Sequence, residues 1–158
     1  MEKLDKTDLK ILSILQQNAA AAVADIAAQV NLSVTPCWRR IQRLERDGYI
    51  RHRVALLDQQ KLNVGVTVFV AIKTSNHSTE WLEQFRETVN AIPEILSMYR
   101  LSGNVDYLLQ LVLPDIAAYD KVYKQLIAKV SFQEVSSMFS MEEMKATTAI
   151  PLDYYPLL

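Results

Sequence analysis

The sequence is poor in the residues that disulfides, metal sites and most catalytic centres require. It has one cysteine, Cys37, and two histidines, His52 and His77, among 158 residues. A single cysteine excludes an internal disulfide and favours a reducing compartment, so we expect a cytoplasmic protein. Cys-x-x-Cys, His-Glu-x-x-His, Gly-x-Ser-x-Gly and glycine-rich phosphate motifs are all missing. The sequence therefore predicts no catalytic residues, no metal site and no cofactor.

Long apolar runs are also missing. No stretch approaches the roughly 20 apolar residues that span a bilayer, and the N-terminus lacks the basic and apolar regions of a secretory signal. We therefore expect no membrane partner. Half of the residues are apolar and 22% are charged, a balance that favours a packed core over disorder. The length fits one ordinary domain or two small ones.

The net charge of −1 hides an uneven distribution of charge. Residues 31–54 contain six arginines against two acidic residues, whereas the chain after Gln60 carries eight basic and eleven acidic side chains. A basic segment on a neutral or acidic body is typical of a protein that binds nucleic acid.

The first 57 residues predict a winged helix-turn-helix domain. Apolar residues at helical spacing predict helices over 5–18 and 22–30, the first with Asp5 as its N-cap and with Asp8 in its first turn. Ser33 is the expected N-cap of a third helix, which runs to about Asp47 and ends before Gly48. Residues 49–57 predict a strand with basic side chains, and residues 58–63 a linker.

The third helix has two unlike faces at about 100° per residue. Cys37, Ile41 and Leu44 point inward, and the best interpretation of Cys37 is a small buried thiol. The outward arc is basic and polar, and such a helix can read base edges in the major groove of double-stranded DNA while flanking arginines hold phosphates. The predicted contacts on the third helix are Ser33, Thr35, Pro36, Trp38, Arg39, Arg40, Gln42, Arg43 and Arg46.

Two alternatives remain for these basic residues. The outward arc of the third helix can be a solvated charged face, although the short turn before it and the excess of arginine argue against this. Arg51 and Arg53 are predicted to form a small wing that contacts the DNA backbone, but an ordinary basic strand edge explains them almost as well.

The second half of the chain predicts a separate domain over residues 64–158. Strands are expected at 64–74, 95–101, 105–113 and 135–147, with helices at 79–91 and 115–130. The order βαββαβ indicates a ferredoxin-like sandwich, in which two helices cover one face of an antiparallel sheet. The whole chain is thus predicted to be an α+β protein.

The sequence resembles the leucine-responsive/feast–famine (Lrp/AsnC) family of bacterial and archaeal transcriptional regulators over nearly its whole length. The matching segments are residues 4–8, 11–12, 30–37, 43–50, 55–58, 102–109 and 141–145. Trp38 and the segments 72–81 and 147–152 are most similar to the branch that regulates cysteine breakdown. The resemblance implies a sequence-specific regulator that forms dimers through its C-terminal sandwich, octamers from those dimers, and an association with the nucleoid.

The resemblance also implies that a small amino acid binds between dimers, with cysteine, leucine or methionine as the leading candidates. Exposed amides near Asn104 suit its carboxylate and Asp106 suits its ammonium group. Simple turn chemistry explains Gly103 nearly as well, and Met138 and Phe139 can equally be core or interface residues. The predicted effector contacts are Ser102, Gly103, Asn104, Asp106, Ile116, Met138, Phe139 and Ser140.

Two other functions are compatible with the sequence. An architectural protein of the nucleoid would bind DNA with little sequence preference, and footprinting would show uniform protection. A ferredoxin-like enzyme that processes amino acids would show turnover, but the sequence offers no catalytic group for it.

Overall fold

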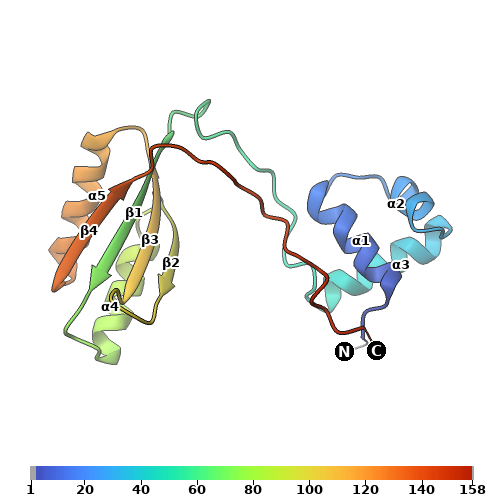
Figure 1. Ribbon diagram of the computed structural model, residues 1–158, viewed down its shortest axis with the longest axis horizontal. Coiled ribbons are helices and arrows are strands. Elements are labelled where there is room, and N and C mark those ends of the chain that lie inside the picture. The colour runs from blue at the N-terminus through green and yellow to red at the C-terminus, as the bar shows by residue number, and fades with distance from the viewer. Residues whose placement is uncertain (1–2, 158) are drawn as a thin grey trace. The chain divides into compact units, whose positions relative to one another are not determined.

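A computed structural model describes residues 3–157 and shows two compact units, each with its own core (Figure 1). The first unit comprises the residues up to Leu56 together with those from Lys145 onward, and the second unit is Leu57–Met144. The second unit is therefore shorter than the domain predicted at 64–158, because the residues from Lys145 onward belong to the first unit. No helix within residues 3–157 is long and apolar enough to cross a membrane.

The first unit contains three helices, α1 (Lys6–Gln17), α2 (Val23–Gln29) and α3 (Val34–Arg46). Their apolar stripes meet in a core that includes Ile11, Ile26 and Leu44, which are fully buried. Asp5 caps α1 as expected, and Asp5 and Asp8 accept each other's backbone N–H in a capping box. Gly48 follows α3 with φ of +79°, a conformation that favours glycine.

Ser33 occupies the N-cap position of α3 as predicted, although its side chain makes no capping hydrogen bond. The strand predicted at 49–57 is wrong. Residues 51–57 form no strand and are exposed, with Leu56 and Leu57 each 71% exposed. Their β-branched and apolar side chains favour a strand, but no neighbouring strand in residues 3–157 pairs with their backbone.

The second unit is the predicted antiparallel βαββαβ sandwich. Its strands are β1 (Val66–Lys73), β2 (Ile95–Arg100), β3 (Tyr107–Leu113) and β4 (Glu134–Phe139), in the order β2-β3-β1-β4. Its helices are α4 (Thr79–Asn90) and α5 (Ile116–Lys129). Because side chains alternate along a strand, Val68, Val70 and Ile72 face the helices and form the core with Phe85 and Leu126.

The opposite side of this sheet carries an apolar surface that neither helix covers. We call it the open face, and Phe69 lies near its centre between Gln110 of β3 and Met138 of β4. Met138 and Tyr99 are 48% and 55% exposed. The residues of the open face are Thr67, Phe69, Ala71, Lys73, Ser97, Tyr99, Leu108, Gln110, Val112, Glu134, Ser136 and Met138, so its apolar centre has a polar and charged margin.

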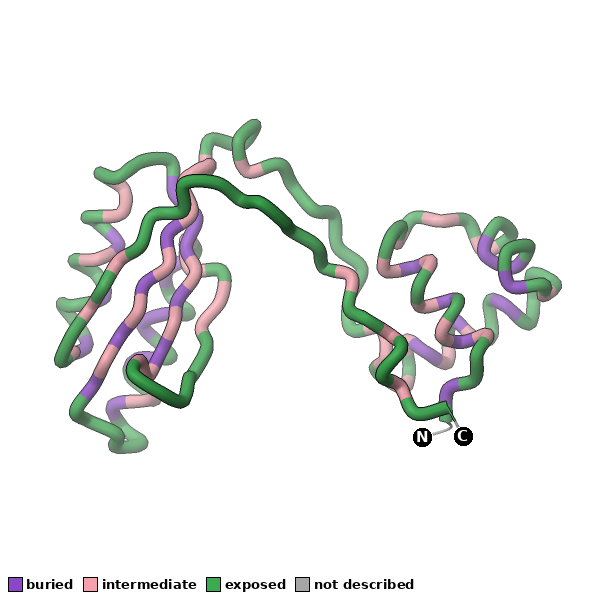
Figure 2. Tube along the Cα trace, in the orientation of Figure 1, coloured by how far each residue is buried: buried purple, intermediate pink, exposed green. Residues whose placement is uncertain are grey.

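The chain after β4 is extended and mostly exposed (Figure 2). The predicted strand 135–147 is therefore too long, because β4 pairs with β1 only as far as Phe139 opposite Val68. The end of the chain docks on the first unit. Gln16 exchanges two hydrogen bonds with the backbone of Ile150, and the Tyr155 hydroxyl accepts the backbone N–H of Leu4.

Candidate nucleic-acid interface

The helix α3 presents an exposed polar and basic arc. Thr35, Arg39, Gln42 and Arg46 are exposed, and the neighbouring Trp38 is 51% exposed. Ser33 and Pro36, at the start of the helix, are also exposed. A short turn between α2 and α3 precedes this surface. Asn31 lies in that turn and has φ of +55°. The inward residues Cys37, Ile41 and Leu44 are at most 2% exposed, so the predicted inner face of α3 is confirmed.

Arg43 lies away from the outward arc, and this part of the prediction is wrong. Its side chain is only 16% exposed, and its guanidinium donates to the Asp8 carboxylate at 2.5 Å. Arg40 lies beside it, 30% exposed, and one of its nitrogens donates to Asp8 at 2.8 Å and to Asp5 at 2.6 Å. Both arginines therefore bind the first turn of α1.

The electrostatics of this cluster favour its charged state. Burial raises the pKa of the Asp5 carboxyl, but the hydrogen bond from the Asp8 backbone N–H and the contact with Arg40 outweigh that effect and leave this pKa below its ordinary value. Hydrogen bonds to Asp8 and Asp5 raise the pKa of the Arg40 guanidinium. Both groups therefore stay ionised at neutral pH.

Cys37 has the properties expected of a structural thiol. It is fully buried, and burial raises the pKa of its thiol. A redox-active cysteine needs an accessible thiolate, so the interpretation of Cys37 as a small core residue is supported.

The other arginines differ in how they are paired. Arg46 contacts Asp47 and Arg53 contacts Glu45, and both pairs are partly exposed. Arg53 also donates to the Ala19 carbonyl. Within residues 3–157, Arg39 and Arg51 have no carboxylate within 4 Å. The acidic partners lie at the start of α1 and at the end of α3, and the spacing of residues along α3 alone does not predict that they pair with these arginines.

The predicted effector residues do not form one site within a single chain. Asp106 hydrogen-bonds to Ile72 at one end of β1, and Ser140 hydrogen-bonds to Thr67 at the other end. Five residues of strand separate these positions, or about 16 Å. Ser102, Gly103 and Asn104 are exposed and lie in the same turn as Asp106. Met138, Phe139 and Ile116 lie toward the other end of the sheet, near Ser140.

Asp106 has a structural role in the turn between β2 and β3. Its carboxylate accepts the backbone N–H of Thr74 at 2.8 Å, and its own backbone N–H donates to the Ile72 carbonyl. Gly103 has φ of +128°, so the turn itself favours glycine at this position. Contact between Asp106 and an effector ammonium stays a prediction.

Alanine at Asp106 is expected to lower the free energy of unfolding of the second unit by about 1–3 kcal/mol, because the N–H of the buried Thr74 loses its acceptor. Urea unfolding measures this cost. Asp120→Ala is the matched control, since Asp120 makes only an exposed ion pair with Lys124 and its loss should cost below about 0.5 kcal/mol. Equal costs for the two variants would contradict the structural role of Asp106.

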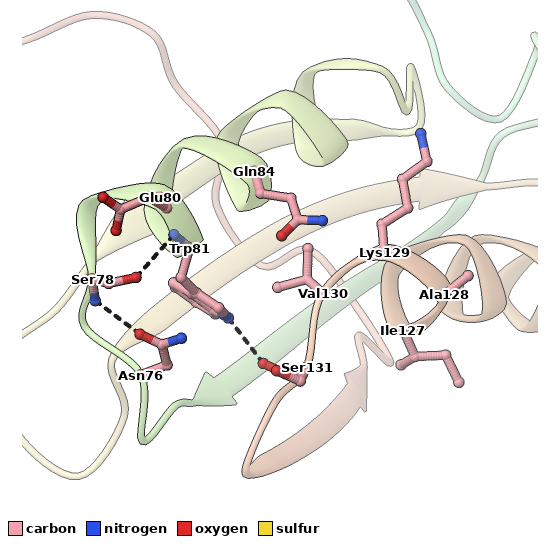
Figure 3. Close-up of a pocket in the computed structure, with 10 residues that line it drawn as sticks. All are labelled: Asn76, Ser78, Glu80, Trp81, Gln84, Ile127, Ala128, Lys129, Val130 and Ser131. Atoms are coloured by element: carbon pink, nitrogen blue, oxygen red, sulfur yellow. Dashed lines mark hydrogen bonds between the residues drawn. The ribbon is translucent and has the colours of Figure 1, made fainter.

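A cavity of about 480 Å³ lies between the start of α4 and the end of α5 (Figure 3). None of the predicted effector residues lines it. Some of its polar groups are engaged with one another, since Ser78 accepts from the backbone of Trp81 and the Trp81 ring N–H donates to the Ser131 carbonyl. We therefore assign no ligand to it. The part of the chain that the structure describes also contains no cluster of metal-ligating residues.

Comparison with known proteins identifies both units. A family model of winged helix-turn-helix DNA-binding domains matches residues 4–51, and the model of the Lrp/AsnC ligand binding domain matches residues 67–150. The chain belongs to the Lrp/AsnC family. The members of this family are transcriptional regulators, so the chain is a DNA-binding regulator with an amino-acid-binding domain and not an enzyme.

Several Lrp/AsnC proteins match this chain from end to end. The glutamate uptake regulatory protein of Zymomonas mobilis is 48% identical over 152 residues, which are 96% of this chain and 93% of that protein. The crystal structure of an AsnC family transcriptional regulator from Agrobacterium tumefaciens has a TM-score of 0.92 and 59% identity over 96% of this chain and 99% of its own. A transcriptional regulator from Neisseria meningitidis in complex with L-Met has a TM-score of 0.91 and 36% identity over 96% and 98% of the two chains.

Proposed function

We propose that this Lrp/AsnC regulator reads its operator with the outward arc of α3, and that Arg51 and Arg53 contact the DNA backbone. The exposed set of Thr35, Arg39, Gln42 and Arg46 supports this assignment. Arginine can bind guanine and glutamine can bind adenine through paired hydrogen bonds in the major groove. Arg39 is the strongest candidate, because no carboxylate in residues 3–157 neutralises it.

Alanine at Arg39 is expected to weaken operator binding by about 10- to 100-fold, which corresponds to one lost base contact of roughly 1–3 kcal/mol. The operator is first located by footprinting on genomic fragments, where a few protected sites are expected rather than the uniform protection of an architectural protein. Affinities of wild type and variant are then compared at one salt concentration. Arg86→Ala, an exposed arginine on α4, is the control. Unchanged affinity of the Arg39 variant would exclude the outward arc as the reading surface.

The open face supports self-association of the second unit. An apolar surface of this kind on an antiparallel sheet commonly packs against another layer, and the second copy of the chain is the partner that we propose. A dimer with two-fold symmetry would present two α3 helices to half-sites about one helical turn apart. Assembly into octamers and association with the nucleoid in the cytoplasm are part of the same proposal.

A second copy also offers a way to complete the effector site. The turn at Ser102–Asp106 and the group at Ile116, Met138, Phe139 and Ser140 are too far apart within one chain to contact one small amino acid. Residues from adjoining copies can supply both groups, so we place the effector between dimers. The L-Met complex of the Neisseria protein supports methionine, and cysteine and leucine are the other candidates.

A thermal-shift screen of the twenty amino acids tests the effector assignment, because a ligand that binds the folded protein raises its apparent stability. We expect one or a few amino acids to raise the melting temperature, and we expect the same amino acids to change DNA binding.

A further inference from the structure

An ion-pair cluster joins α1 to α3. It brings the N-cap Asp5 and the first-turn residue Asp8 of α1 to the guanidinium groups of Arg40 and Arg43. Asp8 is its centre, because its carboxylate contacts both arginines and also accepts the Asp5 backbone N–H at 3.0 Å. Asp8 is only 1% exposed, so water cannot readily replace the arginines at its carboxylate, and a DNA phosphate cannot readily displace that carboxylate from them.

The pairs made by the other arginines of this unit are more open than the two pairs of Asp8. The Arg46 side chain is 73% exposed beside Asp47, and the Arg53 side chain is 41% exposed beside Glu45. Exposed ion pairs contribute little free energy, so a DNA phosphate can displace these carboxylates. The two classes of pair therefore differ in whether their arginines remain available to DNA.

We propose that Asp8 is a positioning residue that fixes α3 on α1 and holds Arg40 and Arg43 off the DNA, which limits sequence-independent binding. This inference rests on the proposed function of α3. Phosphate contacts supply most of the affinity for arbitrary DNA but carry no sequence information. Two arginines withheld from phosphates thus lower non-specific affinity and leave base reading to Arg39, Gln42 and Arg46.

The salt dependence of DNA binding measures this effect directly. The slope of log K against log salt steepens by about 0.9 for each phosphate contacted. With a short duplex of arbitrary sequence, Asp8→Asn is expected to steepen the slope by about 1–2 and to tighten binding severalfold at low salt. A merely structural role for Asp8 would not steepen the slope. Adding Arg40→Gln and Arg43→Gln to Asp8→Asn should restore the wild-type slope.

Asp47→Asn is the matched control, because it makes the same chemical change at a carboxylate whose partner, Arg46, has a 73% exposed side chain that phosphate can already reach. Its slope is expected to stay at the wild-type value. A folded Asp8→Asn variant with an unchanged or shallower slope would overturn the proposal.

Single variants keep the proposal testable if Asp8→Asn fails to fold. Arg40→Gln and Arg43→Gln, each in the wild-type protein, should leave the slope unchanged. A slope that becomes shallower by about 1 in either variant would show that the arginine contacts phosphate and would overturn the proposal. Failure of the proposed function has a different signature, since Arg39→Ala would then leave operator affinity unchanged, whatever slope Asp8→Asn shows on the arbitrary duplex.

Discussion

Arginine in place of Phe69 is expected to prevent two copies of the second unit from pairing. Phe69 lies on β1, a central strand, and its neighbours across the sheet on the open face are Gln110 and Met138. Pairing through this face would bury the new guanidinium, and the carboxylate of the open face, Glu134, lies at the end of the sheet and already pairs with Lys73. An unpaired buried charge costs several kcal/mol. We expect the dimer dissociation constant to rise by at least about 100-fold. Sedimentation velocity over a range of protein concentrations measures the change.

Asn90→Arg is the matched control for Phe69→Arg. It adds the same charge at an exposed position on the last turn of α4, on the opposite side of the sheet. Circular dichroism should show that both variants are folded. A Phe69→Arg protein that sediments like wild type would exclude the open face as the principal contact between copies.

Loss of pairing also has a consequence for DNA. A monomer can occupy only one half-site, so its affinity for the full operator should fall while each α3 keeps its residues and its fold. Phe69→Arg and Arg39→Ala thus weaken operator binding by different routes. Only the first changes the assembly state, and sedimentation separates the two.

Periodicity predicted the elements well because each helix or strand is decided largely by its own residues. The inward positions Cys37, Ile41 and Leu44 follow from the helical repeat. The core positions Val68 and Val70 follow from the two-residue repeat of a strand. These patterns arise within one element and need no knowledge of its neighbours.

The position of Arg43 could not be predicted in that way. Arg43 is close to Arg39 around the axis of α3, so the helical repeat places both on the outward arc. Only the packing of α1 beside α3 shows that the carboxylate of Asp8 lies on the side of Arg43. When an arginine can reach either a phosphate or a buried carboxylate, the tertiary structure decides which of the two it binds. Its position in the helical repeat does not.

The strand predicted at 49–57 and the residues 141–147 of the strand predicted at 135–147 failed for a related reason. The apolar residues Val54, Leu56 and Leu57 favour extended backbone, and the backbone is indeed without helix there. A strand also needs a neighbour that accepts and donates its backbone hydrogen bonds. Within residues 3–157 neither segment has one, and the sequence of an extended segment does not say whether such a neighbour exists.

Alanine in place of Phe85 is expected to lower the free energy of unfolding of the second unit by about 3–5 kcal/mol. Phe85 is fully buried at the centre of an aromatic cluster, with ring centroids 5.1 Å from Trp81, 5.2 Å from Tyr107 and 5.5 Å from Phe132. Alanine removes these contacts and leaves a cavity that three rigid rings cannot readily fill. Phe85→Leu preserves more of the volume and should cost no more than about 1.5 kcal/mol.

The two tryptophans allow this loss to be assigned to one unit. Trp81 lies in the core of the second unit and Trp38 lies on the first, so a Trp38→Phe background leaves Trp81 as the reporter of the second unit. Its fluorescence in urea should show the full loss for Phe85→Ala. The Trp38 signal, read in a Trp81→Phe background with and without Phe85→Ala, should keep its transition, because the core around Ile11, Ile41 and Leu44 shares no residue with that of Phe85. A parallel loss in both signals would mean that the two units unfold as one.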